Sequence, residues 1–402
     1  IFSVFVLTYG MSKGIPQHVL LKGVLLAAAV ELVAIPLFIL MGELLLWSGL
    51  SERLYRVLSH WLSPLPGGLM HSNIAACAIF AAVSGSSPAT VVAIGSILLP
   101  AMVKQGYPMK FGVGVIGTAG GLGILIPPSI VMVIYAVSTN SSIGKLFIAG
   151  IVPGILLAAL LLAVTWAVAV KRGYPRLAKA SWKERFQSFR DSIWGLLLIV
   201  VVIGGIYTGL FTPTEAAAMS AVYAFVVAVF VYRDMTFKQV PKVLLDSANM
   251  SAMLLYIITN AVLFSFLLTS ENIPQDLAAW ITGMGLSPWT FLLVVNLLLL
   301  VAGNFMEPSS ILLITAPILF PVAMKLGIDP IHFGIVMTVN MEIGMITPPV
   351  GLNLYVASGI ARMGLTEVTK ACAPWLLVML AYLVLITYVP AISLWLPQLL
   401  GM

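Results

Sequence analysis

The chain has 402 residues, of which 61% are hydrophobic and only 8% are charged. Soluble domains carry about 25% charged residues, so this composition excludes an ordinary globular protein. Several apolar runs exceed the roughly 20 residues that cross a bilayer as a helix, and they lack the alternation of a membrane β-barrel. The sequence predicts an all-α polytopic membrane protein embedded in a lipid bilayer.

The net charge of +6 does not indicate a nucleic-acid partner, because seven of the 20 Lys and Arg residues fall in one loop between Lys171 and Arg190. Such loops set membrane orientation. Cys77 and Cys372 lie in apolar stretches and are expected to be buried packing residues. The four histidines form no metal-binding pair, and neither a GxSxG nor a P-loop motif occurs, so the sequence argues against an enzyme.

Residues 1–66 are predicted to form scaffold or arm helices. The chain begins at Ile1 in what reads as the end of a helix, so we expect some N-terminal sequence to be missing. A crossing is predicted at about 31–50, with 16–30 either part of it or an interfacial arm. The loop Met11–Lys22 falls outside by this count, although its two lysines oppose the charge rule.

Membrane orientation follows from the basic loop at 171–192, which we take as cytoplasmic. Counting backward, segments 146–170 and 111–135 each cross once. A full crossing by 67–99 would place Arg53 and Arg56 outside, against the rule that Lys and Arg favour the cytoplasm. A re-entrant hairpin over 67–99 keeps both inside, so 67–170 is predicted to be one hairpin followed by a broken helix (111–135) and a crossing.

The second half repeats this order with the opposite orientation. Scaffold helices are predicted over 193–270, at about 193–211, 214–232 and 245–270, ending at an acidic outer loop. The unit 271–402 then has a hairpin at about 290–322 that enters from outside and a broken helix at 331–358. A last crossing at 371–398 leaves the C-terminus periplasmic. Two such units form an inverted-topology repeat, which is typical of secondary transporters.

Prolines mark the two units in register. Gly123-Ile-Leu-Ile-Pro-Pro128 reappears as Gly344-Met-Ile-Thr-Pro-Pro349, and the intervals from Pro127 to Pro153 and from Pro348 to Pro374 are both 26 residues. Proline removes an N–H and pushes the preceding residue out of the α region, so carbonyls near both motifs lose their helical partners. Free carbonyls beside hydroxyls suit Na⁺. The alternative is that these prolines are ordinary kinks in membrane helices.

The hairpin tips are the second polar feature. Ser84-Gly-Ser-Ser-Pro-Ala-Thr90 carries four hydroxyls, and its counterpart is Asn304-Phe-Met-Glu-Pro-Ser-Ser310. Helix N-termini at these tips would present N–H groups to an anion, although small hydroxylated residues also serve helix packing. Glu307 and Glu342 are intramembrane acids that either ligate a cation or are structural. Three further acids are expected at the membrane interface: Glu31, Glu43 and Glu215.

Four long stretches carry a family resemblance. They read SGSSPATVVAIGSILLPAMVKQGYP, GILIPPSIVMVIYAV, NFMEPSSILLITAPILFP and GIDPIHFGIVMTVNMEIGMITPPVGLNLYVASGI. They resemble the large membrane subunit (DctM-type) of tripartite ATP-independent periplasmic (TRAP) transporters, most of all its C4-dicarboxylate branch, with sialic-acid and other organic-acid branches next. The resemblance covers essentially the whole chain.

This resemblance implies an elevator-type, Na⁺-driven symporter of a bacterial inner membrane, with two or more Na⁺ ions as the only cofactor. It also implies a small four-helix membrane subunit and a periplasmic substrate-binding protein as partners. The Na⁺ sites would pair each hairpin with the broken helix of its own half, at Ser84, Gly85, Ser86, Gly123, Ile126 and Pro127 and at Asn304, Met306, Glu307, Ser309, Gly344, Ile346 and Thr347. The substrate would lie between the tips, at Ser87, Thr90, Ser129, Ser310 and Asn353.

We therefore expect a Na⁺-coupled importer of small organic anions, with C4-dicarboxylates first and sialic acid or another carboxylate sugar as the alternative. No Lys or Arg lies within the site motifs, so the anion would be held by N–H groups, hydroxyls and bound Na⁺. A passive anion channel is the alternative of another class, since broken helices and hairpins also build pores. The third hypothesis is a subunit that serves assembly of the complex and does not itself transport.

Overall fold

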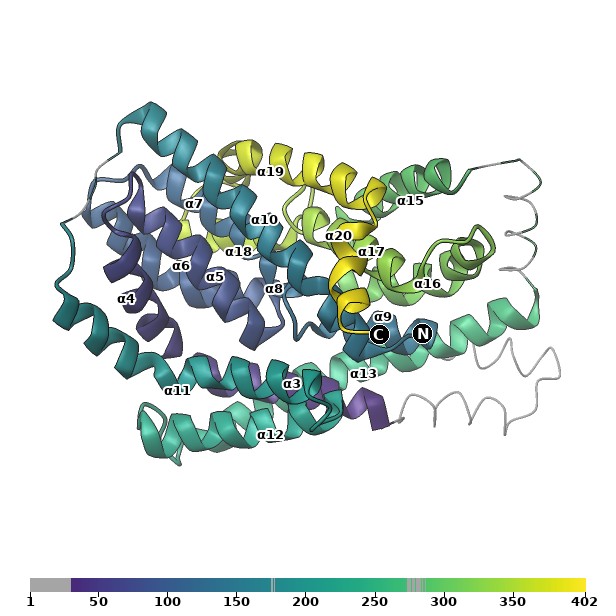
Figure 1. Ribbon diagram of the computed structural model, residues 1–402, viewed down its shortest axis with the longest axis horizontal. Helices are drawn as coiled ribbons and strands as arrows, with labels where there is room; N and C mark the ends of the chain where they lie inside the picture. Colours follow the sequence, from purple (N-terminus) through teal and green to yellow (C-terminus); the bar gives the residue numbers. More distant parts are fainter. Residues whose placement is uncertain are drawn as a thin grey trace.

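The computed structural model describes residues 30–174, 176, 178–272, 276, 279, 283, 285 and 287–402. The predicted arm over residues 1–29 and part of the acidic loop after Ser270 lie outside these residues. Within the described ranges all regular elements are helices (Figure 1). They are η1 (Val30–Val33), α3 (Ala34–Trp47), α4 (Leu50–Leu62), α5 (Gly68–Ser84), α6 (Ser87–Lys104), α7 (Met109–Ala119), α8 (Leu122–Leu125), α9 (Ile130–Thr139), α10 (Ile143–Arg172), α11 (Trp182–Tyr207), α12 (Pro213–Val226), η2 (Val227–Val231), α13 (Val240–Ser270), α15 (Pro288–Gly303), α16 (Pro308–Lys325), α17 (Pro330–Gly344), α18 (Leu352–Ala361), α19 (Leu365–Tyr388) and α20 (Ala391–Leu399).

The apolar helices are long enough to cross a membrane. Eight spans among the described residues meet this length and composition, or nine if the pair α3 and α4, bent by 67°, counts as one more. The bend lies at Gly49, whose φ of 61° belongs to the left-handed region that glycine adopts readily. The prediction of an all-helical, multi-pass membrane protein is confirmed.

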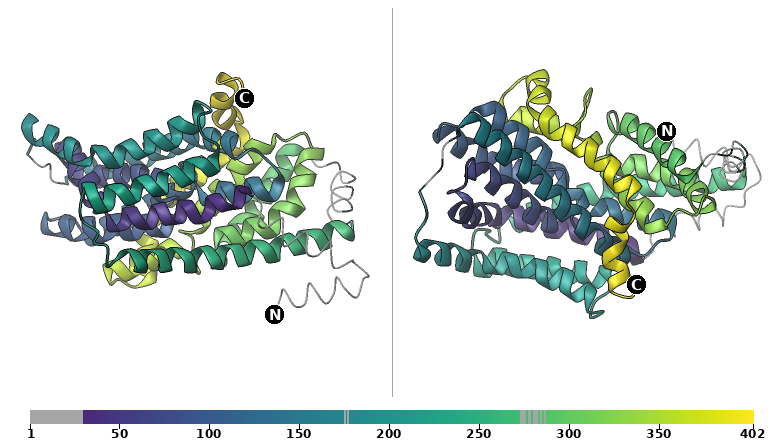
Figure 2. Two further views of the ribbon diagram at one scale, coloured as in Figure 1. Left: turned by 90° about the horizontal axis from the view of Figure 1, so that it is seen from below. Right: turned by 45° about the horizontal axis from the view of Figure 1, so that its top comes forward.

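Four helices form one layer of the molecule. In Figure 1 α3, α11, α12 and α13 run side by side below the rest, and Figure 2 shows the same four as neighbouring rods. Helix α3 packs against both α12 and α13. The buried face of α12 consists of small residues, which let helix backbones approach closely in a membrane. These residues are Ala216, Ala217, Ser220, Ala221 and Ala224.

Two helical hairpins lie against this layer. Helices α5 and α6 pack together and are joined by Gly85 and Ser86, whereas α15 and α16 pack together and are joined by residues 304–307. In Figure 1 the first hairpin lies to the left and the second to the right. Pro88 and Pro308 occupy the first turns of α6 and α16, where a missing N–H costs nothing. The two segments predicted as hairpins, 67–99 and 290–322, thus fall on these two helix pairs.

Both predicted broken helices are broken. The first comprises α7, α8 and α9, and Ile126 before Pro127 is extended, with φ −81° and ψ 123°. The second comprises α17 and α18, which are separated by residues 345–351. The Pro127–Pro128 and Pro348–Pro349 peptide bonds are both cis. The packing crosses between the halves, because α6 lies against α18 and α16 lies against α9.

Charged helix ends gather at one end of the molecule. Lys110, Arg172 and Lys370 line a common pocket at the ends of α7, α10 and α19, and Arg53 forms an ion pair with Asp234. At the opposite end Asn140, Thr212 and Met402 line another pocket. The residues at each end are ones that the predicted orientation, based on the Lys and Arg of the loops, places on the same side of the membrane. Which side is cytoplasmic stays a prediction.

Two predicted segments are divided differently in the structure. Helix α10 ends at Arg172 and α11 begins at Trp182, so both ends of the predicted basic loop 171–192 are helical. Ser181 and Glu184 form a reciprocal capping box that fixes this start. The predicted crossing 371–398 is two helices, α19 and α20, because Pro390 supplies no N–H to continue α19.

Candidate functional site

One cavity of about 450 Å³ lies where both hairpin tips meet the layer of α3 and α13. Its lining includes residues of both tips, both helix breaks, α3 and α13. The lining residues are Ile39, Gly42, Glu43, Leu46, Ser84, Gly85, Ser86, Ser87, Pro88, Ala89, Val92, Ile124, Ile130, Val131, Met250, Met253, Leu254, Glu307, Pro308, Ser309, Met345 and Leu352. Among these described lining residues the only charged side chains are the acids Glu43 and Glu307.

The first tip is neutral and rich in hydroxyls. Gly85 takes the left-handed conformation, with φ 59°, and Ser86 is extended, so the chain reverses before α6 begins. The Ser84 hydroxyl is 2.9 Å from Thr90 Oγ1, which donates to the Ser86 carbonyl at 2.8 Å. The Ser86 side chain makes no cap hydrogen bond to α6. The N-terminus of α6 therefore faces the cavity, with the Ser84 and Thr90 hydroxyls bonded within the tip.

The second tip carries an acid. Glu307 is the N-cap of α16: its Oε2 accepts from the Ser310 N–H at 3.2 Å, and its Oε1 accepts from the Ser309 hydroxyl at 2.8 Å. Its side chain is exposed to the cavity. The structural role that the sequence left open for Glu307 is thus present, and its charge still faces the cavity. Met306 is exposed beside it, and Ser310 is half-buried and does not line the cavity.

The first break lies directly against the first tip. A Cβ on Gly123 would lie 2.8 Å from the Ser86 carbonyl oxygen, so only glycine fits there. Pro127 has no N–H for the Gly123 carbonyl, and within the described residues no other donor reaches it. The Ser129 hydroxyl donates to the Ile124 carbonyl at 2.5 Å. Ile126 and Pro127 face α10 instead: Ile126 contacts Gly154, and Pro127 lies by Phe147.

The second break lies against the second tip, and more of its backbone carbonyls accept hydrogen bonds than at the first break. The Val350 N–H donates to the Asn304 carbonyl at 3.1 Å, and the Asn353 N–H donates to the Met345 carbonyl at 2.9 Å. Thr347 donates from its hydroxyl to the Ile343 carbonyl at 2.7 Å. A Cβ on Gly344 would lie 2.7 Å from the Gly303 Cα, so α17 and α15 touch backbone to backbone.

Most of the predicted substrate residues do not reach the cavity. Ser87 lines it, but Thr90, Ser129 and Asn353 are completely buried. Asn353 Nδ2 donates to the Ser87 hydroxyl at 2.6 Å and so joins the second broken helix to the first tip. These three side chains position the tips and breaks in this structure rather than forming the cavity wall.

Of the predicted Na⁺ residues, five line the cavity and a sixth lies directly behind its wall. Ser84, Gly85, Ser86, Glu307 and Ser309 line it, and Gly123 lies behind Ser86. Asn304 and Met306 belong to the second tip but do not line the cavity, and Gly344, Ile346 and Thr347 form the second break behind that tip. Among the described residues no three His, Cys, Asp or Glu side chains cluster, so a cation here would rely on carbonyls, hydroxyls and single acids.

One acid, Glu43, departs from expectation. Glu43 was expected at the membrane interface, but it is half-buried in the cavity wall on α3. The sequence feature that could have identified Glu43 is its position inside an apolar crossing, since an intramembrane acid is by default a candidate functional residue. Glu215 caps the start of α12, as expected for a helix end, and the Glu31 side chain lies outside the described part. Glu342 is completely buried beside Gly121, and no hydrogen-bond partner for it occurs among the described residues.

A polytopic helical protein whose two hairpin tips face one cavity has the architecture of a membrane transporter. The structure resembles that of the Alcanivorax borkumensis YdaH transporter with a TM-score of 0.64, at 17% identity over 91% of this chain and 85% of that one, which shows the fold alone.

Sequence relatives identify the family. Residues 1–392 match the family described as tripartite ATP-independent periplasmic transporter, DctM component. The chain is 64% identical to the C4-dicarboxylate TRAP transporter large permease protein DctM of Rhodobacter capsulatus, over 92% of this chain and 88% of that protein. It is 37% identical to the sialic acid TRAP transporter large permease protein SiaM of Vibrio cholerae, over 92% and 86%. The chain belongs to the DctM family of TRAP transporter large permeases, which are transporters and not enzymes.

Proposed function

We propose that this permease imports C4-dicarboxylates in symport with Na⁺. The observation that carries the proposal is a cavity lined by both hairpin tips, whose charged lining side chains among the described residues are both acids. Its volume of about 450 Å³ accommodates a four-carbon dianion. The dicarboxylate assignment rests on the 64% identity to a permease named for these substrates.

Charge balance supports the coupling to Na⁺. A dianion that enters this cavity meets Glu43 and Glu307, and the part of the chain that the structure describes places no Lys, Arg or His in the cavity lining. Desolvated like charges repel strongly in a low-dielectric site, so the anion needs positive partners. The N-terminus of α6 supplies a partial positive charge. Bound Na⁺ at the Gly123 carbonyl and beside Glu307 would supply the rest, so substrate would bind well only after Na⁺.

The packing supports movement of the hairpins and breaks as one body. Helix α6 lies on α18, α16 lies on α9, and Asn353 holds Ser87 across the two halves. We propose that these elements are an inverted repeat that slides as an elevator along the layer of α3, α11, α12 and α13. The cavity between tips and layer would then open to alternate sides of the membrane.

The partners follow from the tripartite family. We propose that a periplasmic binding protein delivers the substrate and that a small membrane subunit completes the permease in a bacterial inner membrane. A relative, the isethionate permease protein DctMQ of Oleidesulfovibrio alaskensis, is longer, and this chain matches 57% of its length.

Uptake in proteoliposomes with the partner proteins tests the proposal. We expect saturable uptake of labelled succinate driven by an inward Na⁺ gradient, with sialic acid as the competing substrate. Equal rates under a Na⁺ gradient and under a K⁺ gradient alone would contradict Na⁺ coupling. Rapid, non-saturable flux would instead indicate a channel. Preference for sialic acid would overturn the dicarboxylate assignment and leave the coupling intact.

A further inference from the structure

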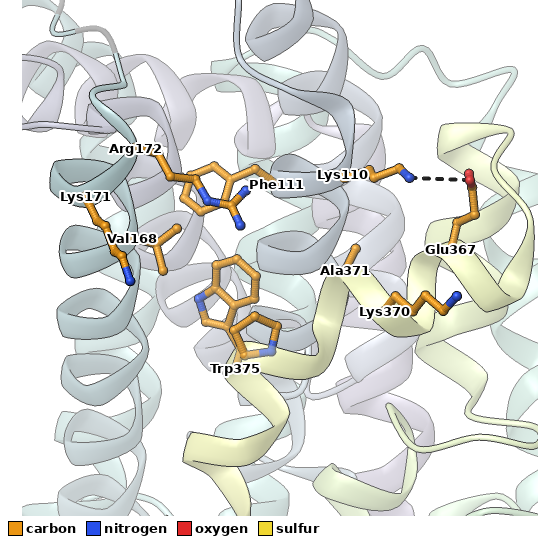
Figure 3. A pocket seen from close by; sticks show the side chains of 10 residues that line it. Lys110, Phe111, Val168, Lys171, Arg172, Glu367, Lys370, Ala371 and Trp375 are labelled. Carbon is orange, nitrogen blue, oxygen red and sulfur yellow. Dashed lines mark hydrogen bonds and ion pairs between the residues drawn. The ribbon is translucent and has the colours of Figure 1, made fainter.

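A second hollow lies far from the hairpin tips, at the ends of α7, α10 and α19 (Figure 3). Its volume is about 580 Å³, and it shares no lining residue with the central cavity. The lining residues are Lys110, Phe111, Val168, Lys171, Arg172, Glu367, Lys370, Ala371, Pro374 and Trp375. The dicarboxylate proposal makes no use of this pocket.

The rim of this pocket has an excess of positive charge. Its four cations come from three helices that are far apart in the sequence, and its one acid, Glu367, is 3.4 Å from Lys110 Nζ. Among the described residues Lys171, Arg172 and Lys370 have no acidic partner. Three positive charges thus remain for an anion from outside the chain.

The floor of the pocket is apolar and rigid. The Phe111 and Trp375 rings lie 5.4 Å apart and are almost fully buried. Trp375 donates from Nε1 to the Thr165 hydroxyl at 2.9 Å, so its one polar atom is already satisfied. Val168, Ala371 and Pro374 complete the floor. Figure 3 shows the two aromatic rings between the cations of α10 and those of α7 and α19.

Cationic rim and apolar floor together fit an amphipathic anion. Orientation by charge alone needs only exposed Lys and Arg near the ends of membrane-crossing helices, as between residues 178 and 190. Here the cations converge over a hollow at the ends of membrane-crossing helices. Basic pockets between such helices on the cytoplasmic side bind anionic lipid headgroups, and a small hydrophilic anion would gain nothing from the aromatic floor.

We propose that this pocket holds an anionic phospholipid, with its phosphate among Lys171, Arg172 and Lys370 and its glycerol and upper acyl chain over Phe111 and Trp375. The bound lipid would link α10 to α7 and α19 at the end of the molecule predicted to be cytoplasmic. Because ligand that binds only the folded state stabilises it, anionic lipid should also raise the thermal stability of the purified protein.

The test is a lipid titration of the full chain in nanodiscs that contain phosphatidylcholine with increasing phosphatidylglycerol, read by native mass spectrometry. The double variant Lys171→Gln/Lys370→Gln removes two rim charges. Each charge near an anionic headgroup contributes about fivefold, so we expect about 30-fold weaker retention of phosphatidylglycerol. The control Lys179→Gln/Lys183→Gln removes the same charge outside the pocket and should change retention less than about twofold.

Three outcomes would overturn the proposal: equal loss in the pocket variant and the control, no preference for phosphatidylglycerol over phosphatidylcholine, or full displacement of the lipid by millimolar glycerol phosphate. The last would assign the pocket to a soluble phosphate. The charge-conserving variant Lys171→Arg/Lys370→Arg should retain the lipid. Should the double variant fold poorly, Lys370→Gln alone, which alters an exposed side chain, should weaken retention about fivefold.

Discussion

The two hairpin tips hold similar positions and have different chemistry. The first tip is uncharged, its Ser84 and Thr90 hydroxyls bond to each other, and the cap residue of α6 leaves the helix end open to the cavity. The second tip closes the end of α16 with Glu307, whose carboxylate accepts two hydrogen bonds and still faces the cavity. An open helix N-terminus favours an anion, and a carboxylate favours a cation.

The two breaks differ in the same sense. At the second break the Thr347 N–H donates to the Gly344 carbonyl at 3.2 Å and the Asn353 N–H donates to the Met345 carbonyl at 2.9 Å, so both carbonyls that Pro348 and Pro349 deprive of partners are satisfied. At the first break Ser129 satisfies Ile124, and the Gly123 carbonyl remains available. The shared proline pattern thus determines where backbone carbonyls lose their hydrogen-bond donors. The neighbouring side chains determine which ligand each break and tip can bind.

The largest effect is expected for Gly123→Ala. The added methyl would meet the Ser86 carbonyl at 2.8 Å and the Ser87 nitrogen at 3.0 Å, both backbone atoms. Overpacking of this kind costs about 1–3 kcal/mol, and displacing the first tip should lower uptake by at least about tenfold. Gly359→Ala is the matched control in the other broken helix, since a Cβ there meets nothing within 4 Å. Equal uptake by both variants would refute close contact of tip and break.

Glu307→Gln separates the charge of the second tip from its capping role. The amide oxygen can still accept from the Ser310 N–H, so we expect little change in melting temperature. Losing the carboxylate should raise the Na⁺ concentration for half-maximal uptake roughly tenfold, as for loss of a charge-assisted contact. Glu52→Gln, at an exposed acid outside the cavity, should leave it unchanged. An unaltered Na⁺ requirement in Glu307→Gln would reduce Glu307 to a helix cap.

A double-mutant cycle measures the bond between the first tip and the second broken helix. Asn353 Nδ2 donates to Ser87 Oγ at 2.6 Å, with both side chains buried. We expect a coupling free energy of about 0.5–1.5 kcal/mol between Ser87→Ala and Asn353→Ala in thermal unfolding. If the two effects simply add, the halves are not joined at this point and the single moving body loses one of its supports.

The smallest effects are expected for the hydroxyls. Ser86→Ala and Thr347→Ala should each raise the Na⁺ requirement about two- to threefold, as for loss of one weak oxygen ligand. The Ser86 change should be the larger, because Ser86 lines the cavity and Thr347 donates to the Ile343 carbonyl behind it. Normal Na⁺ dependence of uptake in both variants would remove these positions from the candidate site.

Much of the fold follows from the sequence alone. Continuous apolar runs give the helices, and the paired prolines mark the breaks and tips because they remove N–H groups. The start of α11 was predicted about ten residues too late, because the basic residues before it were interpreted as a loop. The helix in fact begins at the Ser181–Glu184 capping box.

The cavity wall could be predicted only in part. The tips were found because their polar residues stand out in apolar segments. Glu43 stood out as an acid inside an apolar crossing, but its place in the cavity wall depends on the packing of α3 beside the first tip. Thr90, Ser129 and Asn353 were assigned to substrate, but in this structure they turn inward to satisfy polar groups that the tips and breaks expose.

Cysteine protection tests most directly whether the anion lies between the tips and needs Na⁺. Val92 lines the cavity and is exposed, whereas the native Cys77 and Cys372 are buried, so a maleimide should label Val92→Cys selectively. Val103→Cys, at the far end of α6 and outside the cavity, is the control. We predict that succinate with Na⁺ slows labelling of Val92→Cys alone and that succinate with K⁺ does not. Equal protection in K⁺, or none in Na⁺, would contradict the account.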